Sequence, residues 1–527
     1  MPQRRWPALL YSGTVKVLTA AQMRDVDRRT IEAGVPGIVL MENAGHRVVE
    51  FLVEKFSPLS KHRVLVVCGK GNNGGDGLVI ARQLFIRVKP RALHVVLTGD
   101  PADLKGDAAQ NHRMLEVAGC PVSREITPDM RNATLVIDAV LGTGLRGPAE
   151  GKALEVIRQM NSEFRDATVI AVDVPSGIES DTGQVNGEVV RADKTVTFTA
   201  PKVCQVLSPA AELCGGLRVG AIGSPPSMFE DDASIQLSLA QPTVFRDLFA
   251  PRPVESNKGL YGHVLTIAGG RGKTGAAAMT GFAALRAGAG LSTVGSAESA
   301  LNAIASYSPE VMTAPLMETE GGLISAIPAE LLEKKTVVAI GPGLGTHDQT
   351  IQVVRRAIRE VSLPMVVDAD ALNSLDVNEL PGPGPRVLTP HPGEMGRLTG
   401  RPIREIQANR VETARAFAQQ RGVYLVLKGH RTLTAAPDGR VFVNPTNSPA
   451  LATGGTGDVL TGIIAGLIAQ FPDQLEAAVL AAVYLHGRCG QLGAAEIGEK
   501  SFVATDILRL LPLAMREVAE GFNPTLV

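Results

Sequence analysis

The chain has little of what marks nucleic-acid-binding and membrane proteins. Only 4% of its 527 residues are aromatic, and we find no basic stripe with interleaved aromatic residues, so recognition of RNA by base stacking is not expected. The 52 basic and 53 acidic residues nearly cancel, so no sequence-wide field attracts nucleic acid or an anionic membrane. No uncharged run reaches the roughly 18 residues that a membrane span needs. We therefore expect no nucleic-acid partner and no membrane partner.

Cysteine is also scarce, and its spacing excludes two kinds of site. The five cysteines form no CxxC pair and no metal-ligand spacing, which predicts scattered thiols in a reducing compartment rather than a disulfide framework or a zinc site. The first residues, MPQRRWPALLYSG, contain an apolar stretch too short for the core of a signal peptide. We therefore expect a cytoplasmic protein.

Chain length and pattern predict two domains. A chain of 527 residues is too long for one hydrophobic core. Apolar strand-like runs alternate with helical patterns over residues 62–175, which predicts a parallel sheet covered by helices on both faces. The pattern lapses into proline-rich, polar sequence over residues 223–257 and then resumes without a visible repeat. We expect two different α/β domains, residues 1–230 and 254–527, joined by a linker at 231–253.

The first strand-like run leads into a glycine-rich turn. In VLVVCGKGNNGGDG, Gly69, Gly71 and Gly74 match GxGxxG, the fingerprint of a dinucleotide-binding crossover. That fingerprint keeps its acidic residue about 20 positions further on, whereas Asp76 here follows the last glycine pair directly. An acid inside the turn would repel a pyrophosphate, so the motif alone does not indicate a dehydrogenase.

Three polar motifs follow strands of the first half. They are GKGNNGGDG, DAVLGTGLRGP at residues 138–148 and DVPSG at residues 173–177. In an open parallel sheet, ligands bind where strands end and turn into helices. Each motif pairs glycine with an acid or a hydroxyl, so together they predict a small-molecule site. Two alternatives stay open: a motif can be only a tight connection, and Asp173 can be a helix N-cap.

The combination of NNGGD, DAxxGTG and DxPSG resembles the NAD(P)H-hydrate epimerases over roughly residues 18–224, which implies a Rossmann-like three-layer domain. In that resemblance Asp173 contacts the reacting ring and is catalytic, while Asn73, Asp138 and Ser176 bind potassium. Their carboxylate, amide and hydroxyl oxygens suit such a hard cation. The implied substrate-binding residues are Asn72, Asn73, Gly74, Gly75 and Asp76, followed by Gly142, Thr143, Gly144, Leu145, Arg146, Gly147 and Pro148.

The second half contains phosphate-site motifs of another kind. GGRGKTGAA ends like a P-loop, but Ile267 stands where the first glycine of a Walker motif belongs. ATGGTGDVLTG predicts a helix whose free amides and positive dipole end face phosphate, with Asp458 in its first turn. An acid beside a phosphate site indicates a metal or a proton transfer. The alternative is an Asp that only favours the helix N-terminus.

HPGEM together with TGGTGD resembles the ADP- or ATP-dependent NAD(P)H-hydrate dehydratases, relatives of ribokinase-like kinases, from residue 254 to the last helices. The resemblance implies a ribokinase-like α/β domain that uses Mg²⁺ with the nucleotide, bound mostly through phosphates and waters. His391 can also be a hydrogen-bonded core histidine. The implied hydrate-binding residues are Ala276, Gly345, His391 and the catalytic Asp458, and the implied nucleotide-binding residues are Lys428, Gly429, His430, Arg431, Thr432 and Gly457.

These resemblances imply one bifunctional enzyme, an isomerase and a lyase, for nicotinamide nucleotide repair. It would epimerise the R and S hydrates of NADH and NADPH (NADHX and NADPHX). It would then dehydrate the S form by phosphorylating its hydroxyl from ADP or ATP and eliminating phosphate. Fusion of both modules resembles the prokaryotic arrangement, which favours ADP, and we expect a homo-oligomer. Two alternatives remain: a small-molecule kinase of the hydroxymethylpyrimidine or sugar type with a regulatory first half, and a first half that is a protein- or RNA-binding module.

Overall fold

The computed structural model describes residues 14–521, which form two compact units. The first unit runs from Val15 to Ile235, and the second begins at Gln236. The N-terminal stretch on which the signal-peptide expectation rests, residues 1–13, lies outside the described residues. Each unit is α/β, as the sequence predicts, and each is described here by itself.

The first unit is built on a parallel sheet with the strand order β3-β2-β4-β5-β6-β7. Its strands are β1 (Val15–Lys16), β2 (Arg63–Cys68), β3 (Ala92–Leu97), β4 (Leu135–Ala139), β5 (Thr168–Val172), β6 (Lys194–Phe198) and β7 (Gly216–Gly220). Its helices are α1 (Ala20–Glu32), α2 (Gly37–Phe56), α3 (Asn72–Gln83), α4 (Gly106–Val117), α5 (Gly151–Glu163) and α6 (Val203–Val206).

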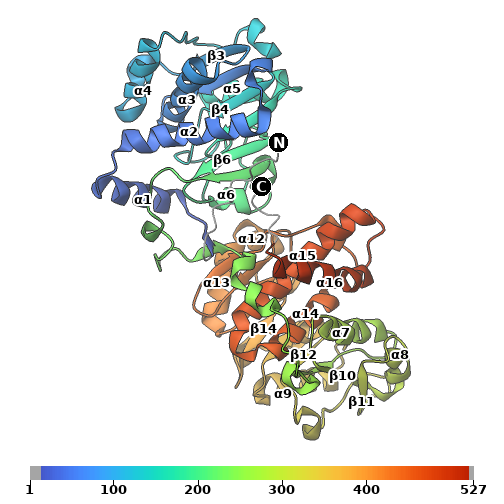
Figure 1. Ribbon diagram of the computed structural model, residues 1–527. Helices are drawn as coiled ribbons and strands as arrows, with labels where there is room; N and C mark the ends of the chain where they lie inside the picture. Colours follow the sequence, from blue (N-terminus) through green and yellow to red (C-terminus); the bar gives the residue numbers. More distant parts are fainter. Residues whose placement is uncertain (1–13, 522–527) are drawn as a thin grey trace. The chain divides into compact units, whose positions relative to one another are not determined.

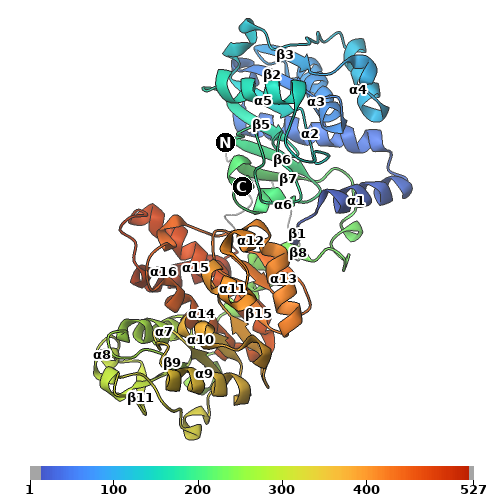
Figure 2. The same ribbon diagram turned by 180° about the vertical axis from the view of Figure 1, so that it is seen from behind.

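Helices cover both faces of this sheet because its central strands are apolar on both sides. Along β2, Val64 and Val66 join a core with α2, α3 and α4, whereas Leu65 and Val67 join a core with α5. Figure 1 shows α2, α3 and α4 on one side of the sheet, and Figure 2 shows α5 on the other. These three layers are the Rossmann-like arrangement that the sequence predicts.

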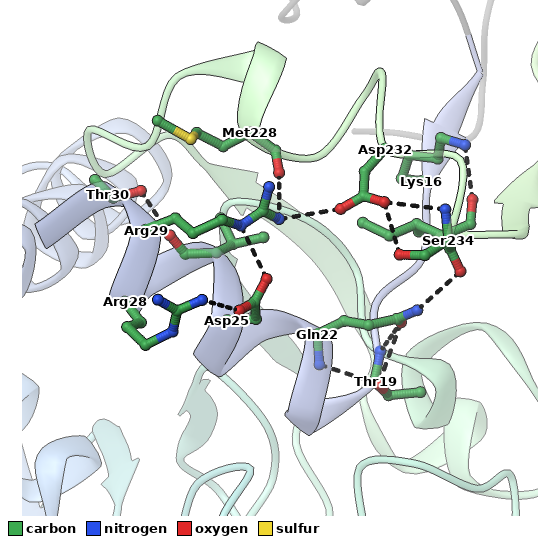
Figure 3. Close-up of polar contacts among 12 residues, drawn as sticks. Lys16, Thr19, Gln22, Asp25, Arg28, Arg29, Thr30, Met228, Asp232 and Ser234 are labelled. Atoms are coloured by element: carbon green, nitrogen blue, oxygen red, sulfur yellow. Dashed lines mark hydrogen bonds and ion pairs between the residues drawn. The ribbon is translucent and has the colours of Figure 1, made fainter. Parts of the chain in front are cut away.

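The end of the first unit is bound to helix α1. Arg29 donates to the carbonyl oxygen of Met228 at 2.7 Å and pairs with Asp232 at 3.1 Å. Lys16, just before the helix, donates to the carbonyl oxygen of Ile235 at 2.7 Å. Figure 3 shows these contacts along one side of α1. The first five residues of the segment predicted as a linker, residues 231–235, are therefore a folded part of this unit.

The second unit contains a longer, mixed sheet with the order β8-β17-β16-β15-β14-β13-β12-β9-β10-β11. Its strands are β8 (Leu237–Leu239), β9 (His263–Ile267), β10 (Leu291–Ala297), β11 (Met312–Leu316), β12 (Val337–Ile340), β13 (Met365–Val367), β14 (Arg386–Leu388), β15 (Tyr424–Leu427), β16 (Leu433–Ala435) and β17 (Val441–Val443).

Strands β9 to β15 of this sheet are parallel, whereas β15, β16 and β17 are antiparallel, a feature that the sequence motifs did not indicate. Strand β8 pairs with β17, so the predicted linker also supplies a strand of the second unit. The helices are α7 (Thr274–Arg286), α8 (Leu301–Ala305), α9 (Asp348–Glu360), α10 (Asp370–Ser374), α11 (Pro392–Thr399), α12 (Ile403–Ala408), α13 (Arg410–Arg421), α14 (Thr456–Gln470), α15 (Leu475–Glu496) and α16 (Ala504–Ala519).

Helices α7, α14, α15 and α16 share one apolar core with one face of the second sheet. Helix α14 lies so close to α7 that a Cβ at Gly462 would collide with the carbonyl oxygen of Thr280. Figure 2 shows α9, α11 and α13 on the other side of the sheet. Within residues 14–521, no single helix is long and apolar enough to cross a membrane, and α14 and α15 meet those criteria only as a pair bent by 118°.

Candidate active sites

The first candidate site lies at the carboxyl edge of the first unit's sheet. Strands β2, β4 and β5 are neighbours and parallel, so the three predicted motifs follow them at one edge. The glycines of the first motif serve close packing: a Cβ at Gly69 would collide with the carbonyl oxygen of Val140, and one at Gly74 with that of Gly69. The GxGxxG pattern therefore brings the start of α3 against the end of β4, which explains the motif without a dehydrogenase.

The three residues predicted to bind potassium lie together. The Ser176 hydroxyl donates to Asp138 Oδ1 at 2.5 Å, and the Ser176 amide donates to Asp138 Oδ2 at 2.7 Å. Asn73 donates from Nδ2 to the carbonyl oxygen of Leu141 at 3.0 Å, and the Leu141 amide donates to Ser176 Oγ at 2.8 Å. Asn73 Oδ1 is buried and accepts no hydrogen bond from any residue between 14 and 521.

The Asp173 carboxylate is held by a buried lysine. Lys202, whose side chain is 1% exposed, pairs with Asp173 Oδ1 at 2.7 Å. Thr197 on β6 donates to the same oxygen at 3.0 Å, and Gln205 donates to the Asp173 carbonyl oxygen at 2.6 Å. Asp173 has φ +64°, so it adopts the left-handed conformation at the strand end and does not cap a helix. Its side chain remains 16% exposed and faces the site as a carboxylate with its own cation.

Two predicted substrate-binding segments adjoin this pair. Asp76 lies in the second turn of α3, and its burial, followed by the charges of Asp173 and Asp27, raises its pKa well above the usual range. In the segment 142–148, Gly144, Arg146 and Pro148 are exposed. Arg146 pairs with Asp181 at 3.1 Å. The segment remains accessible to a ligand at the edge of the sheet.

The second candidate site lies at the carboxyl ends of β9, β12, β13, β14 and β15, which are consecutive parallel strands. Asp368 follows β13 and is 1% exposed. It accepts from Lys428 Nζ at 2.8 Å and from the Thr461 hydroxyl of α14 at 2.8 Å. Asp458, in the first turn of α14, has its pKa raised to about 6 by burial and by Asp368, although Lys428 lowers it.

His391 caps helix α11 and belongs to the same edge. Its Nδ1 accepts from the amide of Gly393 at 3.0 Å, and its own amide donates to Glu394 Oε2 at 2.7 Å. The same Glu394 oxygen lies 3.9 Å from Lys428 Nζ. The His391 side chain is 51% exposed, so it is no core histidine. The structure therefore brings His391, through Glu394, into the neighbourhood of Lys428.

The remaining predicted residues of this half lie at the same strand ends. Gly345 donates its amide to Asp370 Oδ2 at 2.7 Å, and Ala276 lies beside Gly343 of the same GPGLG turn. A Cβ at Gly457 would lie 3.4 Å from Lys428 Nζ, so Gly457 leaves room beside that ammonium group.

The segment from Lys428 to Thr432 connects β15 to β16. The carbonyl oxygen of His430 accepts from Arg410 at 2.6 Å, and the Thr432 hydroxyl donates to the carbonyl oxygen of Gly429 at 2.9 Å. Arg431 has φ +55°. These contacts fix the backbone of the segment predicted to bind the nucleotide.

Sequence reasoning missed three residues of these sites. Lys202 stands in the apolar context TAPKVC, where nothing in the sequence shows that its ammonium group turns back to Asp173. Glu394 belongs to the HPGEM motif, where it was given no role, and Asp368 stands in the stretch DADAL, residues 368–372. Asp368 directly follows β13, and Glu394 lies in the first turn of α11, the helix that follows β14; these positions after strand ends were the available signal.

Together, the fold and these two sites define a two-domain α/β enzyme with a separate polar site on each sheet. Residues 37–204 match a family model described as YjeF-related protein N-terminus, and residues 264–513 match one described as NAD(P)H-hydrate dehydratase. The chain is 42% identical over 521 residues to the bifunctional NAD(P)H-hydrate repair enzyme Nnr of Moorella thermoacetica, covering 96% of this chain and 97% of that one. The chain belongs to the family of bifunctional NAD(P)H-hydrate repair enzymes.

Other relatives extend the comparison. The Escherichia coli enzyme of the same name is 36% identical over 85% of this chain and 84% of its own. A crystal structure of the ADP/ATP-dependent NAD(P)H-hydrate dehydratase of Bacillus subtilis, co-crystallised with ATP/Mg²⁺, is 33% identical; it covers 53% of this chain and 98% of its own, with a TM-score of 0.46.

The family assignment confirms the predicted pair of enzyme activities. The observed sheets and the two family models confirm the predicted fold class. The alternatives of a small-molecule kinase and of a binding module are set aside with it. The individual site residues and the extents of the two functional domains stay predictions.

Proposed function

We propose that the first unit interconverts the R and S hydrates of NADH and NADPH, and that the second unit dehydrates the S hydrate at the expense of ADP or ATP. The observation that carries the proposal is Asp458, a partly buried carboxyl in the first turn of α14, near the ammonium group of Lys428. A carboxyl with a pKa of about 6 beside a cation suits removal of a hydroxyl proton next to a phosphate.

Epimerisation requires an acid and a base at the hydroxyl-bearing carbon. In one route the acid protonates the hydroxyl, water leaves as the ring nitrogen's electron pair forms C=N, and water returns to the other face, giving a proton back to the carboxylate. In the other, a base takes the hydroxyl proton, the C–N bond breaks to leave a carbonyl, and an acid protonates the nitrogen; closure on the other face reverses each transfer. Asp173, exposed to the site and paired with Lys202, is the proposed base.

Potassium fits the first site. Asn73 Oδ1 is a buried oxygen with no donor among residues 14–521, and the Asn73 amide and the Ser176 hydroxyl both lie within hydrogen-bond distance of the Leu141 carbonyl oxygen, next to Asp138. Hard oxygen donors suit an alkali cation, which supplies positive charge next to the anionic substrate when bound. Asn73, Asp138 and Ser176 would hold it. The adjoining segments 72–76 and 142–148 would bind the dinucleotide.

In the second unit, Asp458 accepts the proton of the substrate hydroxyl while that oxygen attacks the terminal phosphorus of the nucleotide. Elimination of phosphate then follows, driven by the electron pair of the ring nitrogen, and loss of a ring proton restores the dihydronicotinamide. Lys428, Gly429, His430, Arg431, Thr432 and Gly457 would bind the nucleotide, and Ala276, Gly345 and His391 would position the hydrate.

Magnesium fits this second site through the nucleotide. Within residues 14–521, no three His, Cys, Asp or Glu side chains are grouped as a metal cage, and Mg²⁺ commonly binds through phosphates and one or two carboxylates. Asp368 and Asp458 are the carboxylates near the proposed phosphate position, and the ion would supply charge that neutralises the phosphates. We further propose a cytoplasmic homo-oligomer that uses ADP in preference to ATP and has no nucleic-acid or membrane partner.

The test uses the full chain with purified R and S hydrates, ADP or ATP, and Mg²⁺. We expect dihydronicotinamide absorbance to recover from the S hydrate only with nucleotide, and from the R hydrate only when the epimerase acts first. The rate with R hydrate should fall when potassium is replaced by a large organic cation, whereas the rate with S hydrate should not. A stable phosphorylated product without recovered absorbance would contradict the proposal.

A further inference from the structure

Helix α1 carries an acid on its inward face. Its buried residues are Ala20, Met23, Val26 and Thr30, and Asp27 lies one helical turn after Met23, on the same stripe. Burying an ionisable side chain on such a stripe costs free energy unless the side chain is paired, hydrogen-bonded or neutral. Asp27 also precedes the matched epimerase model, which begins at residue 37.

The start of α1 is tied to the two segments that build the first site. The Ala20 amide donates to Asp181 Oδ1 at 2.5 Å, and Asp181 follows the DVPSG motif. The Leu18 amide donates to the carbonyl oxygen of Pro201 at 2.9 Å, and Leu18 forms a parallel bridge with Lys202. The opposite side of the helix is held by the contacts from Arg29 to Met228 and Asp232 (Figure 3). Asp27 is thus held on a fixed helix beside the Asp173–Lys202 pair.

Lys202 does not pair directly with all three acids near it, Asp27, Asp76 and Asp173. Lys202 has three N–H bonds, and its Nζ lies within hydrogen-bond distance of three acceptors: Asp173 Oδ1 at 2.7 Å, Thr197 Oγ1 at 2.8 Å and the Phe198 carbonyl oxygen at 2.9 Å. No donor of Lys202 remains for Asp27 or Asp76. Asp27 Oδ1 is buried and has no hydrogen-bond partner within residues 14–521.

The titratable groups that face one another come from four elements. They are Asp27 on α1, Asp76 on α3, Asp173 after β5, and Lys202 and Cys204 before and in α6. Burial raises the pKa of Asp27 to about 6, with Lys202 lowering it and Asp173 raising it. Burial raises the pKa of Asp76 further, and that of the Cys204 thiol well above its usual range. Two acids with raised pKa values, Asp27 and Asp76, therefore belong to this centre, and the ammonium group of Lys202 contacts Asp173 rather than either of them.

We propose that Asp27 is a further catalytic residue of the epimerase centre, the acid that gives and recovers the proton the reaction moves, while Asp173 acts as the base. The inference rests on the proposed epimerase activity. The carboxylic acid of Asp27 gives its proton to the departing oxygen or ring nitrogen, and its carboxylate recovers a proton when water or nitrogen returns. A proton held on Asp76 also removes the repulsion that an ionised acid in this turn would exert on a pyrophosphate.

The test compares Asp27→Asn with Asp25→Asn in the full chain. Both replace an Asp of α1 by an amide of the same size, but Asp25 is 45% exposed and pairs, within residues 14–521, with Arg28 and Arg29 alone. We expect Asp27→Asn to lower the enzyme-dependent rate with R hydrate by about 10²- to 10⁴-fold, the usual range for loss of an acid–base group. Its rate with S hydrate should equal that of the wild type, and Asp25→Asn should match the wild type with both substrates.

A pH profile separates catalysis from positioning. The rate at which the wild type converts R hydrate into S hydrate, measured without nucleotide so that the dehydratase does not act, should change near pH 6, and this transition should be absent in Asp27→Asn. Asp27→Glu, which keeps the carboxyl, should restore part of the rate and the transition. If the wild type repairs both hydrates and Asp27→Asn repairs R hydrate at the wild-type rate, the inference is wrong. If the wild type repairs neither hydrate, the proposed function itself fails.

Discussion

Each unit contains a lysine–aspartate pair at the carboxyl edge of its sheet. The aspartate is the more exposed partner in the first unit, whereas the lysine is the more exposed partner in the second. In the first unit Lys202 is 1% exposed and Asp173 is 16% exposed, with 2.7 Å between Nζ and Oδ1. In the second unit Lys428 is 20% exposed and Asp368 is 1% exposed, with 2.8 Å between Nζ and Oδ1. The first site therefore presents a carboxylate, and the second presents an ammonium group.

This reversal matches the charge that each proposed reaction needs. A carboxylate with an internal counter-ion can accept a proton from a hydrated ring, whereas an ammonium group with an internal counter-ion can meet phosphate. Both sites also hold a second, partly buried acid with a pKa of about 6: Asp27 in the first unit and Asp458 in the second. The inward partner of each pair is a direct counter-ion of the outward partner, and in each proposed reaction the second acid moves a proton.

The largest effect is expected from Asp458→Asn. The amide keeps the size of the side chain and its place in the first turn of α14 but cannot accept the hydroxyl proton. Loss of a general base costs about 10²- to 10⁴-fold in rate, whereas loss of a charge at a helix N-terminus costs about 0.3–1 kcal/mol of stability. We expect dehydration of S hydrate to fall at least about a hundredfold, with near-normal nucleotide binding and unchanged epimerisation.

The pH dependence of the dehydration rate tests the same role of Asp458. Asp458 must be ionised to act as a base, so the wild-type rate with S hydrate should fall as the pH drops below about 6. The residual rate of the variant should not show that fall. An Asp458→Asn enzyme that still dehydrates S hydrate at close to the wild-type rate would return Asp458 to the role of a helix-stabilising residue.

Smaller effects are expected from replacing each lysine, and the two replacements should affect different activities. Lys202→Met leaves Asp173 without its buried cation, and breaking a buried pair costs about 3–5 kcal/mol. Unfolding of the first unit should therefore occur at a lower temperature, and epimerisation should slow. Lys428→Met removes the ammonium group that faces the site, so the KM for nucleotide should rise by about tenfold or more, as expected for the loss of a hydrogen bond to a charged group. Equal nucleotide KM values for Lys428→Met and the wild type would contradict the view that the second site presents an ammonium group to the nucleotide.

The polar motifs of both sites could be read from the sequence because they follow strand ends that apolar runs reveal. NNGGD and DVPSG lie at the carboxyl edge of the first unit's parallel sheet, and TGGTGD leads into helix α14, as predicted. The turn of the first motif is dictated by backbone packing, because Gly69 and Gly74 lie against carbonyl oxygens. Such local requirements are visible in a sequence.

What the sequence did not reveal depends on contacts between distant segments. Lys202 lies in an apolar stretch of the chain and Asp27 in the charged stretch RDVDRR, and only the folded first unit brings them to Asp173, on the end of β5. The antiparallel strands β16 and β17, and β8 within the predicted linker, are three residues each, too short for a clear period-two pattern. Long-range pairing decides these features, and residue spacing does not report it.

The smallest effect concerns stability, and it tests whether the two second acids are alike. Asp27 and Asp458 each have a folded-state pKa near 6, above the ordinary value of 3.8. As pH rises from about 4 to 6, the unfolded chain loses each proton before the folded chain does, so folding stability falls in that window and the penalty is complete above it. A shift of about two units in pKa corresponds to at most about 3 kcal/mol of folding free energy, reduced by partial exposure.

Asp27→Asn and Asp458→Asn, measured separately, should each unfold a few degrees higher than the wild type at pH 8, as expected for about 1 kcal/mol. The gain should vanish near pH 4, where the wild-type carboxyls are protonated as well. Calorimetry at both pH values measures the difference, and a lower unfolding temperature at pH 8 for one variant would mean that its carboxylate is compensated and that the two sites differ.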